Sequence, residues 1–349
     1  MKEGRSLQEL AAELDRQGKT KKDYLANTES LSVKTEQSQT SMQVADKGDF
    51  LVSTLAHGQI AEQLEVPKKY YDRIRGEFPT LYDETVNTLL HGKEATRLIR
   101  TLDGKMRASL SDKYRRLDND QAAEIVFKGL SQFTDVEVKS CEVTEQRLYI
   151  KAITPKVSFD VEGYGKICGG MVFKNSEVGL GPLSAEFLVY NEWCKNGAIR
   201  PDGRFRKAHL GGRNELGEVG ATEFLAEDTK QAIDVAFWKQ FRDFVKEMFN
   251  PEHFAAFVEK MKDGRDEPIN VTGKKAVEEL QDTFKLTDSE SENVLMHLLQ
   301  GGEMNKFGLA NAITRASQDL KDYDRATDFE RLGGQVVELS RTQWAAIAG

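Results

Sequence analysis

The stretch VEVKSCEVTEQRLYIKAI, residues 136–153, decides the fold class of this chain. Apolar and polar residues alternate over 136–143 and again over 147–153, and a period of two is typical of strands with one face on a core. The few polar residues between the two runs predict an antiparallel pair. Two further strand candidates follow at 167–175 and 183–194.

A second hairpin signal lies upstream of this pair. Asp103-Gly104 separates the apolar runs 98–102 and 105–110, and an Asp-Gly pair in that position favours a tight two-residue turn. Apolar spacing over 119–133 predicts a helix between the two hairpins. We therefore expect an α+β fold, in which residues 97–200 form one central, mostly antiparallel sheet with packed helices.

Helical periodicity dominates both flanks of this core. A short helix is expected at 6–17, and two helices around Pro67 form either a helix-turn-helix or a plain helical hairpin. The organisation that we predict has four parts: a helical N-terminal region 1–90 with a polar linker at 27–48, an α+β core 91–220 with basic edges, a long amphipathic helix with a short helix at 221–262, and a helical C-terminal region 263–349. A polar, irregular strand pair is the alternative for 27–48.

Composition limits the class of protein. The 349 residues include 39% hydrophobic and 30% charged residues, which is an ordinary globular balance of roughly two domains. No signal-peptide stretch and no apolar run of membrane-spanning length is present. The three cysteines form no C-x-x-C pair. These features predict a cytoplasmic protein (the host cytoplasm, if a phage encodes it) without a membrane partner, disulfide, structural metal or cofactor.

The net charge of −8 conceals a strong local asymmetry. Residues 93–116 contain eight Lys and Arg against three acidic residues, and residues 195–213 contain six against one. Clustered cations of this kind neutralise phosphates, and interleaved aromatic rings stack on bases. The alternative is a solvated, salt-bridged surface. The candidate nucleic-acid-binding residues are Arg97, Arg100, Lys105, Arg107, Lys113, Tyr114, Arg115, Arg116, Arg204, Phe205, Arg206, Lys207, His209 and Arg213.

A metal-dependent nuclease is a second hypothesis. Glu137-Val138-Lys139 lies on a predicted strand, and Asp118 and Asp120 precede the helix before it. Carboxylates followed by Glu-x-Lys can hold Mg²⁺ and steady the attacked phosphate. No zinc-protease, Walker-type or nucleophile-elbow motif occurs, so no other catalytic set is assigned.

Several segments, in order along nearly the whole chain, resemble a phage- and plasmid-related protein family of unknown function. They are AHGQIA (56–61), VPKKYY (66–71), RTLDG (100–104), RASLSDKYRRLDN (107–119), NSEVG (175–179), CKNG (194–197), His209 and GLANAITR (308–315). The resemblance implies a gene of a phage or mobile element and carries no known catalytic residues.

The expected strand and helix order, with its basic edges, is also similar to the cores of phage single-strand annealing recombinases, a likeness of architecture alone. We therefore expect a non-enzymatic protein that binds nucleic acid, with single-stranded DNA favoured, in recombination or replication, and that forms a homo-oligomer. The alternatives are the nuclease and a non-enzymatic oligomeric interaction protein.

Overall fold

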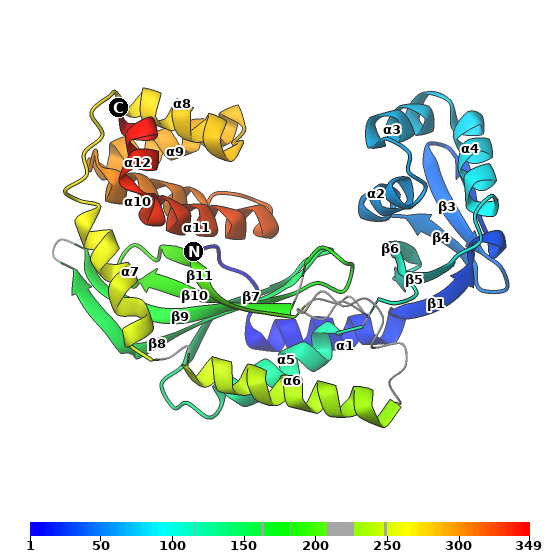
Figure 1. Cartoon of the computed structure of the whole chain (residues 1–349), viewed down its shortest axis with the longest axis horizontal. Helices are drawn as coiled ribbons and strands as arrows, with labels where there is room; N and C mark the ends of the chain where they lie inside the picture. Colours follow the sequence, from blue (N-terminus) through cyan, green and yellow to red (C-terminus); the bar gives the residue numbers. More distant parts are fainter. Residues whose placement is uncertain (115, 162–163, 182, 208–226, 248–249) are drawn as a thin grey trace.

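The computed structural model of the chain is an α+β fold with two separate sheets and a helical C-terminal region (Figure 1). The residues that it describes are 1–114, 116–161, 164–181, 183–207, 227–247 and 250–349. The predicted α+β class is confirmed. The prediction of one central sheet is wrong, because the hairpin at 96–111 joins a different sheet from the strands that follow it.

The first sheet has six strands in the order β1-β5-β6-β4-β3-β2. The strands are β1 (Lys22–Asn27), β2 (Leu31–Glu36), β3 (Gln39–Val44), β4 (Gly48–Val52), β5 (Thr96–Leu102) and β6 (Lys105–Ser111), with a short 3-10 turn at Thr28–Ser30. All neighbours are antiparallel except β4 and β6. One face packs against α2 (Thr54–Gln63), α3 (Lys68–Glu77) and α4 (Pro79–His91).

Residues 27–48, predicted to be a polar linker, belong almost entirely to this sheet. Apolar residues such as Val33 and Met42 are buried against the helices, while the residues between them point to a face that none of the described helices covers. A strand with one bare face needs apolar residues only at alternate positions. That requirement explains the low apolar density of this segment, and the N-terminal region is therefore not wholly helical.

The second sheet is antiparallel, with five strands in the order β11-β10-β9-β8-β7. Its strands are β7 (Glu137–Val143), β8 (Leu148–Val161), β9 (Gly165–Asn175), β10 (Leu183–Asn191) and β11 (Gly197–Lys207). Figure 1 shows α1 (Leu7–Thr20), α5 (Asn119–Leu130) and α6 (Glu227–Glu247) on one face. The predicted helix at 6–17 is confirmed as α1, and Ser6 and Glu9 form its capping box.

The C-terminal helices cover the other face of this sheet and extend beyond it (Figure 1). They follow α7 (Glu252–Asp263) and are α8 (Gly273–Phe284), α9 (Asp288–Gly301), α10 (Lys306–Ala316), α11 (Tyr323–Glu338) and α12 (Arg341–Ala348). The second sheet is therefore a buried middle layer between two layers of helices.

Helix α11 packs on this sheet through paired charges as well as apolar contacts. Lys151 Nζ lies 2.7 Å from Glu330 Oε2, and both side chains are fully buried. Glu186 pairs with Lys174 at 3.3 Å and with Arg331 at 2.6 Å. The alternation in β8 predicts a solvent-facing side; instead its polar residues meet charges on α11, and β8 is buried on both faces over Leu148–Thr154.

Candidate nucleic-acid interface

The loop that follows β9, residues 176–180, belongs to the second sheet and packs against the first. Val178 is buried against Leu98, Ala108 and Leu110 on the face of the first sheet opposite its helices. A Cβ on Gly179, whose φ is +82°, would lie 2.7 Å from the Leu110 side chain, so this contact requires glycine. The apolar contact holds the first sheet against one end of the second.

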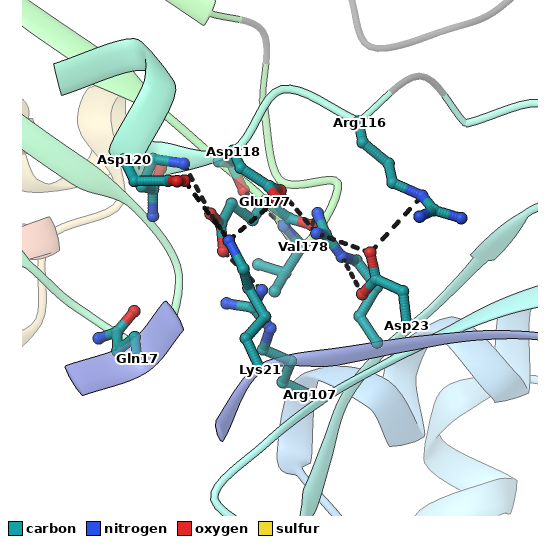
Figure 2. Close-up of polar contacts among 12 residues, drawn as sticks. Gln17, Lys21, Asp23, Arg107, Arg116, Asp118, Asp120, Glu177 and Val178 are labelled. Carbon is teal, nitrogen blue, oxygen red and sulfur yellow. Dashed lines mark hydrogen bonds and ion pairs between the residues drawn. The ribbon is translucent and has the colours of Figure 1, made fainter. Parts of the chain in front are cut away.

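A network of ion pairs surrounds this contact. We call it the sheet junction; its members are Lys21, Asp23, Arg100, Arg107, Arg116, Asp118, Asp120 and Glu177. Figure 2 shows the members other than Arg100 converging from the end of α1, from β1 and β6, from the segment before α5 and its first turn, and from the loop after β9. Arg100 joins them from β5. Its described members are four cations and four carboxylates, so the charges of these eight side chains balance.

Arg100 is the most deeply buried member of the sheet junction, with no exposed surface. Its Nε lies 2.9 Å from Asp23 Oδ1, and its Nη2 lies 2.6 Å from Asp118 Oδ1. Its Nη1 donates to the backbone oxygen of Glu177 at 2.9 Å. The planar guanidinium thus joins β1, the start of α5 and the loop after β9.

Glu177 is the buried anion of the sheet junction. Arg107 Nη2 lies 2.5 Å from its Oε2, and Lys21 Nζ lies 3.2 Å from its Oε1. The backbone N–H of Asn119, the first residue of α5, donates to the same Oε1 at 2.6 Å. A helix N-terminus favours a carboxylate, so this position holds Glu177 as an anion.

The three carboxylates Asp118, Asp120 and Glu177 lie close enough to share a cation, with oxygens within 4.8 Å of one another. The ammonium of Lys21 already lies among them, 2.9 Å from Asp118 Oδ2 and 3.6 Å from Asp120 Oδ1. A lysine in this position supplies the positive charge that a metal would otherwise bring. We therefore assign the cluster a structural role and propose no metal here.

The charges of the sheet junction predict a loss of stability in acid. Burial raises the pKa of Glu177, but Arg107 and the other cations outweigh it, so the pKa lies below its ordinary value of 4.5. Burial likewise raises the pKa of Asp118, but Arg100 and Lys21 lower it more, so this pKa lies below its ordinary value of 3.8. A carboxylate whose pKa is lower in the folded protein than in the unfolded chain stabilises the fold at a pH above the pKa of the unfolded chain. This contribution is lost as the pH falls through the pKa of the folded protein.

We therefore expect the free energy of unfolding to decrease as the pH falls below about 4.5. Glu177→Gln should be less stable at neutral pH and should show a shallower decrease in acid, because the variant has one fewer carboxylate to protonate. Urea titrations across this pH range measure both effects. An acid slope equal to that of the wild type would show that Glu177 does not contribute.

The structure separates the first set of predicted basic residues into two groups. Arg100 and Arg107 lie inside the sheet junction, with side chains 0% and 11% exposed, and are not available to phosphates, whereas Arg116 lies at its surface and is 49% exposed. Lys105, Lys113 and Arg116 are exposed, and Arg97 is half-buried on the helix-covered side of the first sheet. Arg115 lies outside the described residues.

Tyr114 is held in the structure rather than presented for stacking. Its ring is half-buried against the Leu98 and Val178 contact, and its hydroxyl donates to the backbone oxygen of Ser176 at 3.0 Å. This bond brings Tyr114, and with it the neighbouring Lys113, next to the loop after β9. The role for Tyr114 that the geometry supports is to position this exposed basic segment.

The second set of predicted basic residues lies on β11, an edge strand of the second sheet. The segment Arg204–Lys207, including Phe205 and Arg206, pairs antiparallel with Glu186–Leu183 of β10. His209 and Arg213 lie outside the described residues. Lys207 is opposite Leu183, at the end of the sheet where the loop after β9 leads into β10. Both basic segments therefore reach the same end of the second sheet.

The four predicted nuclease residues do not come together. Glu137 pairs with Ile153 on β8, whereas Asn175, just before Glu177, pairs with Leu148. Ile153 and Leu148 are five residues apart along β8, so Glu137 and Asn175 lie about 16 Å apart in the strand direction. Glu137 instead contacts Lys139 at 2.5 Å, and the carboxylate that joins Asp118 and Asp120 is Glu177.

Sequence reasoning missed Lys21, Asp23 and Glu177 as partners of the predicted cations. One signal was present: three of the segments on which the family resemblance rests, 100–104, 107–119 and 175–179, contain most of the sheet junction.

Comparisons with protein-family models, curated proteins and solved structures find no match for the chain. No helix within the described ranges is long and apolar enough to cross a membrane.

Proposed function

We propose that the chain binds single-stranded nucleic acid, with DNA as the favoured ligand, at the end of the second sheet beside the loop after β9. The observation that carries the proposal is the convergence there of two basic segments that lie about 90 residues apart in an acidic chain. The binding needs no covalent chemistry. The resemblance to phage and plasmid proteins implies a gene of a phage or mobile element, and the role that we propose for such a protein is in recombination or replication.

The physical basis is phosphate neutralisation by exposed cations. Lys113 and Arg116 are exposed beside the loop, and the basic part of β11 ends next to it. Arg100 and Arg107 act differently, because they are enclosed in the sheet junction, where they hold the segment that carries Lys113 and Arg116. Binding to a single strand through such contacts weakens with salt, by a slope of about −0.7 in log K against log salt for each phosphate contact.

The test is a salt titration of a labelled oligonucleotide with a double charge reversal. Lys113→Glu with Arg116→Glu should weaken binding at least tenfold and make the salt slope shallower by about 1.4, for two lost phosphate contacts. The matched control is Lys274→Glu with Lys275→Glu, two exposed residues on α8, far from the sheet junction in Figure 1. It should bind as the wild type does.

Two results would refute the proposal: no binding at low salt, or equal weakening by both double variants. Accelerated annealing of complementary strands by the wild type supports an annealing role. Mg²⁺-dependent cleavage that Glu137→Ala abolishes would favour the nuclease instead.

A further inference from the structure

The two edge strands of the first sheet, β1 and β2, differ in whether their outward backbone N–H and C=O groups form hydrogen bonds. In an antiparallel ladder, alternate residues point their N–H and C=O groups away from the neighbouring strand. On β2, the bond from Ala45 N to Ser30 O shows that these outward residues are Leu31, Val33 and Thr35.

Helix α4 closes this β2 edge. Asp83, Asn87 and His91, spaced four residues apart, lie on one side of the helix. The N–H groups of Val33 and Thr35 donate to Asn87 Oδ1 at 2.7 Å and to Asp83 Oδ2 at 2.8 Å. His91 Nε2 lies 2.9 Å from the oxygen of Leu31.

The β7 edge of the second sheet is also covered. Arg5 forms an antiparallel bridge with Cys141, and its Nη1 donates to the oxygen of Val143 at 3.1 Å. Such coverage prevents a free edge from pairing with another chain.

The edge at β1 has no such cover among the residues that the structure describes. Thr28 N donates to Ala95 O, and the ladder with β5 then points the backbone groups of Asp23, Leu25 and Asn27 outward. In the part of the chain that the structure describes, no group bonds to the backbone N–H or C=O of Asp23 or Leu25. The Leu25 side chain, on the face opposite the helices, is 61% exposed.

We infer that a second copy of this chain adds its own β1 to this edge, antiparallel and about a two-fold axis at Leu25. Outward groups pair with outward groups in any register that sets odd-numbered residues of the two strands opposite each other. Among these, the register with each Leu25 opposite the partner subunit's Leu25 is the one that uses Asp23, Leu25 and Asn27 of both strands, because Asp23 then lies opposite the partner subunit's Asn27. Both leucines face the same side of the joined sheet and cover each other. The inference does not depend on nucleic-acid binding.

Charge explains why the partner is another copy. Exposed Lys22 stands at the start of β1, and exposed Glu29 follows its end. Because two-fold pairing is antiparallel, the basic start of each strand lies beside the acidic end of the other. The edge is also held in place before pairing, because Asp23 is fixed by Arg100.

Sedimentation of the full chain tests the inference. The wild type should have twice the 39.3 kDa mass of one chain. Leu25→Lys places two cations opposite each other in the dimer, and Leu25→Pro removes a backbone N–H that β5 does not use. Each variant should weaken dimerisation at least tenfold. Neither should lower the midpoint of thermal unfolding substantially. Leu51→Lys, on the same face but on the inner strand β4, should dimerise as the wild type does.

A cross-link tests the register. Hydrogen-bonded antiparallel partners have Cα atoms about 5.5 Å apart, within the range of a disulfide. Oxidised Leu25→Cys should therefore give a covalent dimer, and Leu51→Cys should give none beyond the wild-type level set by the native cysteines. A monomeric wild type, a dimer that survives both Leu25 variants, or equal cross-linking at the two positions would overturn the inference.

Discussion

Replacement of Arg100 by methionine should destabilise the protein by about 3–5 kcal/mol, the usual cost of removing one partner from a buried ion pair. Methionine retains much of the apolar volume but none of the donors. Asp23 and Asp118 would each lose a contact of less than 3 Å, and the backbone oxygen of Glu177 would lose its donor. Urea unfolding measures the loss.

Arg116→Met is the matched control for this substitution. Arg116 contacts the same Asp23, but at 3.5 Å and with a side chain that is 49% exposed. Exposed pairs contribute less than about 1 kcal/mol. If the two variants lose similar stability, Arg100 does not hold the sheets together. The proposed function, in which Arg116 contacts phosphates, predicts the reverse order for nucleic-acid binding: Arg116→Met should weaken it more than Arg100→Met does.

Glu330→Ala should have an effect of similar size, about 3–5 kcal/mol, by leaving the ammonium of Lys151 buried without its counter-charge. Burial already lowers the pKa of Lys151. The remaining contacts, Thr327 Oγ1 at 3.1 Å and the Tyr323 ring at 4.5 Å, do not replace a carboxylate. We expect α11 to pack less firmly on the second sheet.

The double variant Lys151→Met with Glu330→Leu distinguishes this cause from lost packing. Removing both charges at similar volume should recover most of the stability that Glu330→Ala loses, because no buried charge is left unpaired. Glu124→Ala, which breaks the exposed pair with Lys128 on α5, should cost less than about 1 kcal/mol. No recovery in the double variant would contradict the explanation.

Local features of the fold were predictable from the sequence because they depend on neighbouring residues. Asp103 and Gly104 both adopt positive φ, 51° and 75°, as the predicted turn between β5 and β6 requires. Alternation predicted β7 and the first half of β8, and β9 and β10 were also expected as strands, whereas β11 was not. Alternation does not say which strand is the neighbour, however, so β5 and β6 were predicted to lie in the wrong sheet.

The candidate site was predictable only in part, because a sequence shows charge but not burial. Arg100 and Arg116 are equivalent cations in the sequence, and only the fold places one between two carboxylates and the other at the surface. The partners of Arg100 and Arg107 come from three distant segments with no local pattern. The convergence of the two basic segments likewise depends on Tyr114 bonding to Ser176.

The sheet junction also orders the assembly of the chain during synthesis. The first sheet is complete once Ser111 has emerged, but Arg107 and its carboxylate partner Glu177 are 70 residues apart. Contacts of such long sequence separation form late, because the intervening loop must be closed first. The first sheet therefore folds with Arg107 still solvated, and docking of the two sheets waits until translation has passed Glu177.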